Sequence, residues 1–201
     1  IMIGIIDYGL GNINAFSNIL KTLDVNFIIP KNISEIQACS KFILPGVGAF
    51  DEAVSKIKKL EYYDELEKNI LIKKKKILGI CVGMQVFLEE SEEGSLKGLG
   101  WVNGIVKKFS SSNNRIPHMG WNKIIVNNNN IIIKDIIDAE FYFLHSYYCE
   151  LNEDKKVCAR TDYIQKFCSI FVKDNIYGVQ FHPEKSHDNG LKLINNFVLM
   201  A

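Results

Sequence analysis

The sequence lacks the features that mark membrane, secreted and nucleic-acid-binding chains. No apolar run approaches the roughly 18 to 20 residues needed to cross a bilayer. The opening residues IMIGIIDYG lack the basic region and the long apolar core of a signal peptide. Lys and Arg number 24 against 23 Asp and Glu, so the net charge of +1 offers no basic excess for an anionic partner. We therefore expect a cytoplasmic protein that binds neither nucleic acid nor membrane.

Paired cysteines are also missing. The cysteines number five and include no C-x-x-C pair. Without a secretory signal they are expected to be reduced thiols, not a disulfide framework or a zinc site. The sequence therefore points to no metal ion and no cofactor.

What is present is a chain suited to one folded domain. Its 201 residues are 47% hydrophobic, which is enough for a sizeable core. There is no internal repeat and no linker rich in Pro, Gly or Ser. We expect residues 1–201 to form a single domain.

The first half alternates short apolar runs with amphipathic segments. Strands are predicted at 3–7, 26–30, 42–44 and 77–80, and helices at 12–23, near 34, up to 60 and at 62–76. Continuous apolar strands separated by helices indicate an α/β fold with a mostly parallel central sheet flanked by helices. The run KKKK at 73–76 is interpreted as the solvated end of the last helix.

The second half changes character and predicts an added antiparallel section. Strands are expected at 102–109, 123–126, 141–147, 157–160, 168–172 and 177–181, separated by short turns. The run NNNN at 127–130 is interpreted as a hairpin turn. Ser186 is expected to cap a final helix that ends near Met200.

The segment ILGICVGMQVF at 77–87 is the first candidate for chemistry. A lone cysteine in an apolar run is usually structural. Here Gly79 and Gly83 flank Cys81 two positions away on either side, between a predicted strand and a helix. That spacing is typical of a nucleophile elbow, a sharp turn whose neighbours must lack Cβ. On this segment alone, core filler and nucleophile are about equally good interpretations.

A base for Cys81 is found in GVQFHPEKS at 178–186. In an extended segment, residues two apart point to the same side, so Glu184 can lie beside the ring of His182, with Pro183 stiffening the backbone between them. His182 could then accept the thiol proton while Glu184 orients the ring. A strand-end histidine beside a surface glutamate is the simpler alternative for this segment taken by itself.

Two further segments could bind a substrate. ILPGVGAF at 43–50 places Gly46 and Gly48 after a predicted strand, where backbone N–H groups could stabilise an oxyanion. Taken by itself, this segment is better explained as a plain turn. Gln85 lies one helical turn after Cys81 and faces the same way.

PGVGAF, GICVGMQ and FHPEKS in this order resemble the class I (triad) glutamine amidotransferases, whose fold is flavodoxin-like. The segments IDYGLGN, PHMGWN, FLHSYY and GVQFHPEKS are more closely similar to the glutaminase subunits of imidazole glycerol phosphate synthase. The resemblance covers nearly the whole chain and implies one glutamine amidotransferase domain over residues 1–201. Val82 stands where the family usually has Leu, a conservative difference.

The resemblance implies that glutamine is hydrolysed to glutamate and ammonia through a thioester on a catalytic triad of Cys81, His182 and Glu184. It implies that glutamine and the oxyanion are held by Gly46, Val47, Gly48, Val82, Gln85, His145, Ser146 and Tyr147.

The resemblance also implies a partner. In this family the ammonia passes through a (β/α)8-barrel cyclase subunit, with which the glutaminase forms a heterodimer in histidine biosynthesis. Contact with that partner is assigned to Asn12, Met119, Gly120, Trp121 and Asn122. Because the oxyanion loop of the family completes its site only when the partner is loaded, we expect weak glutaminase activity from the isolated chain.

Three other interpretations of the sequence are possible at first sight. A dinucleotide fingerprint in DYGLGN fails because Asn14 stands at its third glycine position. A paralogous glutaminase that feeds another synthase, for example in sugar amidination, would keep the same motifs. A non-catalytic scaffold is disfavoured because Cys81, His182 and Glu184 are all present.

Overall fold

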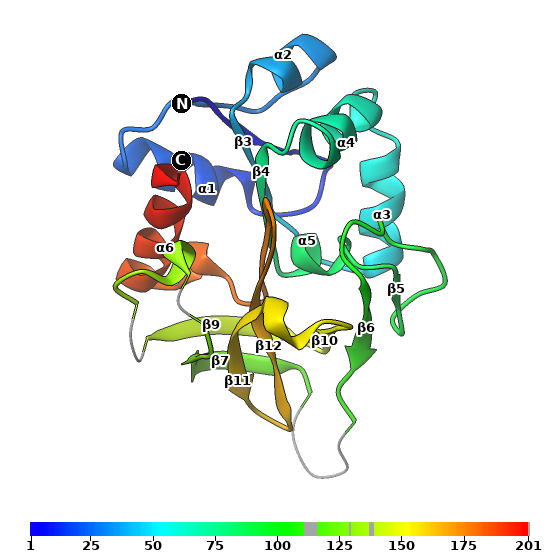
Figure 1. Ribbon diagram of the computed structural model, residues 1–201, viewed down its shortest axis with the longest axis vertical. Helices are drawn as coiled ribbons and strands as arrows, with labels where there is room; N and C mark the ends of the chain where they lie inside the picture. Colours follow the sequence, from blue (N-terminus) through cyan, green and yellow to red (C-terminus); the bar gives the residue numbers. More distant parts are fainter. Residues whose placement is uncertain (111–115, 129, 137–138, 201) are drawn as a thin grey trace.

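The computed structural model describes residues 1–110, 116–128, 130–136 and 139–200. A central sheet, with strand order β2-β1-β3-β4-β13-β12-β10-β6-β5, runs through the molecule (Figure 1). Its first five strands are all parallel: β2 (Phe27–Ile28), β1 (Ile3–Ile5), β3 (Lys41–Leu44), β4 (Lys76–Ile80) and β13 (Ile176–Val179). This order is that of a flavodoxin-like, doubly wound sheet and confirms the expected fold class.

Helices cover both faces of the parallel strands (Figure 1). On one face lie α1 (Ile13–Thr22) and α6 (His187–Leu199), and on the other lie α3 (Phe50–Lys58) and α4 (Tyr63–Leu71). The short α2 (Ile33–Ala38) packs against α4. Burial on both sides explains the continuous apolar strands, since Ile3, Ile5, Phe42, Ile77 and Leu78 are fully buried.

The remaining strands form the antiparallel section. In the central sheet these are β12 (Lys166–Lys173), β10 (Tyr147–Leu151) and β6 (Gly104–Lys108). At the edge of the sheet, β5 (Glu90–Ser91) pairs parallel to β6. β11 (Val157–Asp162) pairs with β12 outside this order, and β8 (Ile125–Val126) pairs with β11. A separate two-stranded sheet pairs β7 (His118–Lys123) with β9 (Glu140–His145). The 3-10 helices are η1 (Ile131–Ile133), η2 (Asp154–Lys156) and η3 (Pro183–Lys185).

The register of the parallel strands brings three chain segments to one edge of the sheet. Leu44 of β3 lies beside Gly79 of β4, and Ile80 of β4 lies beside Val179 of β13. The carboxyl ends of these three strands therefore meet, which is where open α/β sheets bind ligands. The segments that follow them carry Gly46, Cys81 and His182.

Several expectations for the second half were wrong in detail. The strand expected at 141–147 is interrupted at Ser146, so that β9 and β10 belong to different sheets. Residues 118–123 form β7, a strand that the polar and glycine-containing sequence PHMGWN did not indicate. The expected NNNN hairpin is absent among the described residues, because 131–133 form η1 and β8 pairs with β11; Asn129 lies outside the described residues.

Two predicted helix ends also differ. Helix α4 ends at Leu71, and the run KKKK does not extend it. Lys73 forms an ion pair with Glu65 at 2.8 Å, Lys75 donates to the carbonyl groups of Gln37 and Cys39, and Lys76 begins β4. At the last helix, Ser186 occupies the N-cap position, but its side chain makes no capping hydrogen bond. Its hydroxyl donates to the carbonyl of His182 instead, at 2.6 Å.

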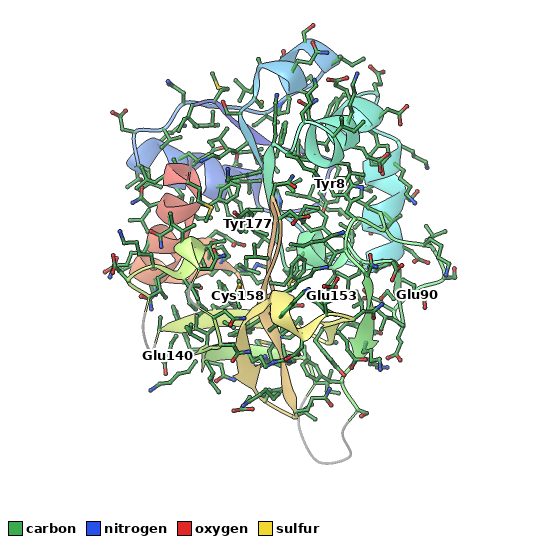
Figure 2. The ribbon with its side chains drawn as sticks, viewed as in Figure 1. Tyr8, Glu90, Glu140, Glu153, Cys158 and Tyr177 are labelled. Carbon is green, nitrogen blue, oxygen red and sulfur yellow. The ribbon has the colours of Figure 1, made fainter. Side chains whose placement is uncertain are left out.

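The interior is apolar in both halves of the molecule. Figure 2 shows Tyr8 and Tyr177 inside the parallel half, whereas Glu90 and Glu140 lie at the periphery. All five cysteines are free and buried. Over the part of the chain that the structure describes, no helix is both long enough and apolar enough to cross a membrane.

Candidate active site

Cys81 lies on a sharp turn between β4 and the short helix α5 (Val82–Gln85). Its backbone has φ 54° and ψ −113°, a conformation that costs a non-glycine residue about 1 to 3 kcal/mol. The N–H of Cys81 donates to the carbonyl of Val179 at 2.9 Å, which ties the turn to β13. Strain of this kind persists only where the surrounding structure imposes it, and here it directs the side chain out of the sheet edge.

The glycines around the turn are required by close backbone contacts. A Cβ on Gly79 would lie 2.4 Å from the carbonyl oxygen of Gly83, and a Cβ on Gly83 would lie 2.1 Å from that of Leu44. A Cβ on Gly46 would lie 2.2 Å from the nitrogen of Gly83. The ends of β3, β4 and α5 are therefore packed backbone to backbone, as the G-x-C-x-G spacing predicted for Cys81.

His182 and Glu184 come together at the same edge. Nδ1 of His182 lies 2.8 Å from Oε1 of Glu184, and the two side chains are only 2% and 3% exposed. The N–H of His182 donates to the carbonyl of Tyr142 at 2.8 Å, which holds the backbone after β13 in place. Cys81 hydrogen-bonds to the same imidazole, whose Nε2 is left free by the contact with Glu184.

The electrostatics of His182 favour its charged form. Burial alone would lower its pKa, but the hydrogen bonds and charges of Cys81 and Glu184 outweigh burial and raise the pKa well above the ordinary value. A protonated imidazole held beside a sulfur nucleophile can donate its proton to a leaving group. The arrangement can therefore supply a nucleophile and a proton carrier in one place.

A cavity of about 260 Å³ opens at this site. Pockets for drug-sized ligands measure about 300 to 1,000 Å³, so this one suits a smaller molecule such as an amino acid. It is lined by Val47, Gly48, Cys81, Val82, Gln85, Glu93, Pro117, Leu144, His145, Ser146, Tyr147 and His182.

Most residues predicted to bind substrate line this cavity. Gly46 is not among the lining residues and packs against the backbone of Gly83 instead. Val47 and Gly48 lie in the loop that follows β3, and both line the cavity. Gly48 has a positive φ of 98° with open space where a Cβ would be, and Val47 is 41% exposed. His145 lines the cavity, and Nε2 of its ring lies 3.0 Å from Nδ1 of His118.

Gln180 is a site residue that the sequence interpretation missed. Its fully buried carboxamide donates through Nε2 to the sulfur of Cys81 at 3.7 Å. Its Oε1 accepts from Nε2 of Gln85 at 3.0 Å, and that contact sets which end of the amide faces the sulfur. The alternation that paired His182 with Glu184 places Gln180 on the same side, so the signal was present.

The residues assigned to partner contact lie in different environments. Met119 and Trp121 project from β7 with 62% and 46% of their surface exposed, and Trp121 stacks on His187 with ring centroids 5.2 Å apart. Asn122 points to the opposite face of β7 and is half-buried. Asn12 caps α1, its Oδ1 accepting from the N–H of Ala15, and Gly120 has a positive φ.

Known proteins match this chain over nearly its full length. The family described as glutamine amidotransferase class-I matches residues 4–201. The chain belongs to that family. Within the described residues, no group of three or more His, Cys, Asp or Glu side chains is placed to hold a metal ion.

The similar curated proteins are subunits of one enzyme. The chain is 46% identical to "Imidazole glycerol phosphate synthase subunit HisH" of Leptospira interrogans, with 98% of each chain covered. It is 45% identical to "Imidazole glycerol phosphate synthase subunit HisH 2" of Methanococcus maripaludis, with both chains covered in full.

Solved structures support the same fold. "Crystal structure of glutamine amidotransferase" superposes with a TM-score of 0.74 at 16% identity, covering 98% of this chain and 99% of the other. "Structure of PurLQS from Thermotoga maritima" gives a TM-score of 0.73 at 17% identity, covering 98% and 97%.

Proposed function

We propose that this single-domain chain hydrolyses glutamine to glutamate and ammonia and supplies the ammonia to a synthase partner. The observation that carries the proposal is the grouping of Cys81, His182 and Glu184 at the edge of a cavity the size of an amino acid. The three side chains come from two segments about 100 residues apart in sequence. Their meeting at the carboxyl ends of adjacent parallel strands supports an acyl-transfer site.

In the proposed reaction, the sulfur of Cys81 attacks the side-chain carbonyl carbon of glutamine. The C–N bond then breaks, His182 donates its proton to the leaving nitrogen, and ammonia departs. His182 next removes a proton from water, which attacks the γ-glutamyl thioester and releases glutamate and the free thiol. Backbone N–H groups around Gly48 and Val82, which both line the cavity, would stabilise the oxyanion.

The names of the relatives support a destination for the ammonia. We infer that the chain is the glutaminase subunit of an imidazole glycerol phosphate synthase, acting in the cytoplasm in histidine biosynthesis with a (β/α)8-barrel cyclase as its partner. The exposed Met119 and Trp121 lie on β7, the strand that follows the cavity-lining Pro117, and support a docking surface there. We expect weak glutaminase activity from the isolated chain, and a high rate without a partner would contradict this coupling.

A comparison of two nitrogen sources tests the catalytic role of Cys81. Cys81→Ala should abolish synthesis from glutamine by the complex and leave synthesis from an added ammonium salt intact. Cys39→Ala is the matched control, because Cys39 is also buried but its sulfur hydrogen-bonds to the carbonyl of Glu35, at the other end of the sheet. Loss of both activities in Cys81→Ala alone would show that Cys81 is needed for folding or assembly.

A paralogous glutaminase serving another synthase is the second candidate. Names numbered 1 and 2 occur among the relatives, so similarity to them does not by itself separate paralogues. Complementation of a histidine auxotroph that lacks its own glutaminase subunit separates the two. Growth supports the histidine pathway. Failure to grow, although Cys81 is labelled by the glutamine-like electrophile diazo-oxo-norleucine, supports the paralogue.

A further inference from the structure

Two buried imidazoles lie beside the site without a part in the proposed reaction. His118 of β7 and His145 of β9 face each other across the two-stranded sheet and are 3% and 6% exposed. The ring of His118 stacks on Phe143 and on Tyr163, with centroids 4.7 and 4.0 Å apart. Burial of polar rings in such a cluster is costly unless every ring nitrogen is hydrogen-bonded.

The hydrogen bonds of these rings run in one direction. The carbonyl of Tyr147 can only accept, so Nδ1 of His145 donates to it at 2.8 Å. Nε2 of a neutral His145 must then accept, and it lies 3.0 Å from Nδ1 of His118. Nε2 of His118 in turn accepts from Nδ2 of Asn122 at 3.2 Å. Both rings are therefore fixed as Nδ1–H tautomers.

Both rings are neutral at ordinary pH. Burial lowers the pKa of His118 to about 4. Burial lowers the pKa of His145 to about 3, against the opposing effect of the Tyr147 carbonyl. The hydrogen-bond directions are thus the same across the whole physiological range.

The same carbonyl links the rings to the nucleophile. Tyr147 also accepts from Nε2 of Gln85 at 3.0 Å. Gln85 donates onward to Gln180, and Gln180 donates to the sulfur of Cys81. A continuous hydrogen-bonded network therefore extends from Asn122 on β7 to the sulfur.

We propose that His118 and His145 are positioning residues that hold the Tyr147 carbonyl, and through it the Gln85 carboxamide, in the orientation that binds glutamine. The inference deepens the proposed function, since it concerns the same cavity. The hydrogen-bonded network also connects that cavity to β7, whose exposed face carries Met119 and Trp121. A shift of β7 would move His118 and change the glutamine site, because β7 belongs to a sheet of only two strands.

His118→Phe tests the proposal because phenylalanine keeps the stacking and removes both hydrogen bonds. The readout is labelling of Cys81 by diazo-oxo-norleucine, a glutamine-like electrophile, followed by mass spectrometry. We expect the concentration for half-maximal labelling to rise about fivefold to tenfold. This is the effect of losing about one hydrogen bond between the misoriented Gln85 and the bound molecule. Labelling by iodoacetamide, which lacks the amino-acid part, should change less than twofold.

Phe167→Leu is the matched control. Phe167 contacts the edges of both rings, with centroids 5.7 and 5.0 Å away, and carries none of the hydrogen bonds. It should lower the melting temperature at least as much as His118→Phe and leave the half-maximal concentration unchanged. Equal shifts of that concentration in the two variants, or none in His118→Phe, would overturn the proposal.

The tautomers provide a readout that is independent of activity. In protein with 15N-labelled histidine at neutral pH, the rings of His118 and His145 should both show a protonated Nδ1 and an unprotonated Nε2. A protonated Nε2 on His145 would overturn the proposal. If the wild-type chain were not labelled by diazo-oxo-norleucine at all, the proposed function would fail, whereas unchanged labelling in His118→Phe would defeat only the positioning role.

Discussion

Nδ1 of His182 lies 2.8 Å from Oε1 of Glu184, two residues further along the same turn, and both side chains are almost completely buried. Pro183 between them fixes φ and begins η3, so that the backbone itself brings the two side chains together. Oε2 of Glu184 has no hydrogen-bond partner among the described residues, so the charge of the carboxylate acts mainly on the His182 ring. A charged imidazole held in this way can donate a proton to a leaving group.

Glu184→Gln should slow glutamine hydrolysis and change the pH dependence of stability. We expect kcat for glutamine to fall about a hundredfold, since the ring loses the carboxylate that orients it and stabilises its charge. The pKa of His182 should fall, because the variant removes one of the charges that raise it. A ring titration followed by NMR measures this shift directly.

The sign of the stability effect follows from the raised pKa. Because the pKa of folded His182 exceeds the unfolded value of about 6.5, its protonation stabilises the folded state fully below that pH. The contribution declines as the pH rises from about 6.5 toward a folded pKa of about 10. Urea unfolding at several pH values should show a smaller decline in Glu184→Gln than in the wild type. An equal decline would show that Glu184 does not stabilise the charged ring.

Gln180 should control the reactivity of the sulfur. Gln180→Leu removes the donor to Cys81 and should slow alkylation by iodoacetamide about tenfold. Gln180→Glu keeps an acceptor for Gln85 but turns a carboxylate toward the sulfur, and it should slow alkylation at least as much. If Gln180→Glu alkylated at the wild-type rate, the contact with Gln85, and not the donor to the sulfur, would be the important one.

Gly83→Ala should destabilise the fold through a direct clash. Its Cβ would lie 2.1 Å from the carbonyl oxygen of Leu44, which the sheet holds in place, so a loss of about 3 kcal/mol is expected. Gly100→Ala is the control, since Gly100 has φ 67° but no atom within 4 Å of an added Cβ, and it should lose only about 1 kcal/mol from backbone strain. Urea unfolding measures both, and equal losses would contradict the role assigned to backbone contact.

Tyr8→Phe should stabilise the protein. The hydroxyl of Tyr8 is buried without a hydrogen-bond partner among the described residues, and its removal should add about 1 kcal/mol to the free energy of unfolding. Tyr63→Phe is the opposite case, because that hydroxyl donates to Glu67 at 2.8 Å, and a loss of about 1 to 2 kcal/mol is expected. A loss of stability in Tyr8→Phe would mean that its hydroxyl finds a partner near Gly46 in solution.

Local sequence predicted the parallel half of the fold well. Strands such as Phe42–Leu44 and Ile77–Ile80 are buried on both faces, so their apolar runs are continuous and easy to identify. The polar β7 was missed because its inward positions are filled by His118, Gly120 and Asn122 instead of apolar residues. The break at Ser146 was missed because both flanking segments have strand composition.

The sequence by itself determined the strained turn at Cys81 and the adjacent base and carboxylate, because glycine spacing and residue alternation act over a few residues. Only the tertiary structure decided that these groups meet. The parallel register of β4 and β13 brings together side chains that lie 101 residues apart, and no local pattern encodes such a pairing. The chain of hydrogen bonds through His118 and His145 likewise depends on the pairing of β7 with β9, and on burial that keeps both rings neutral.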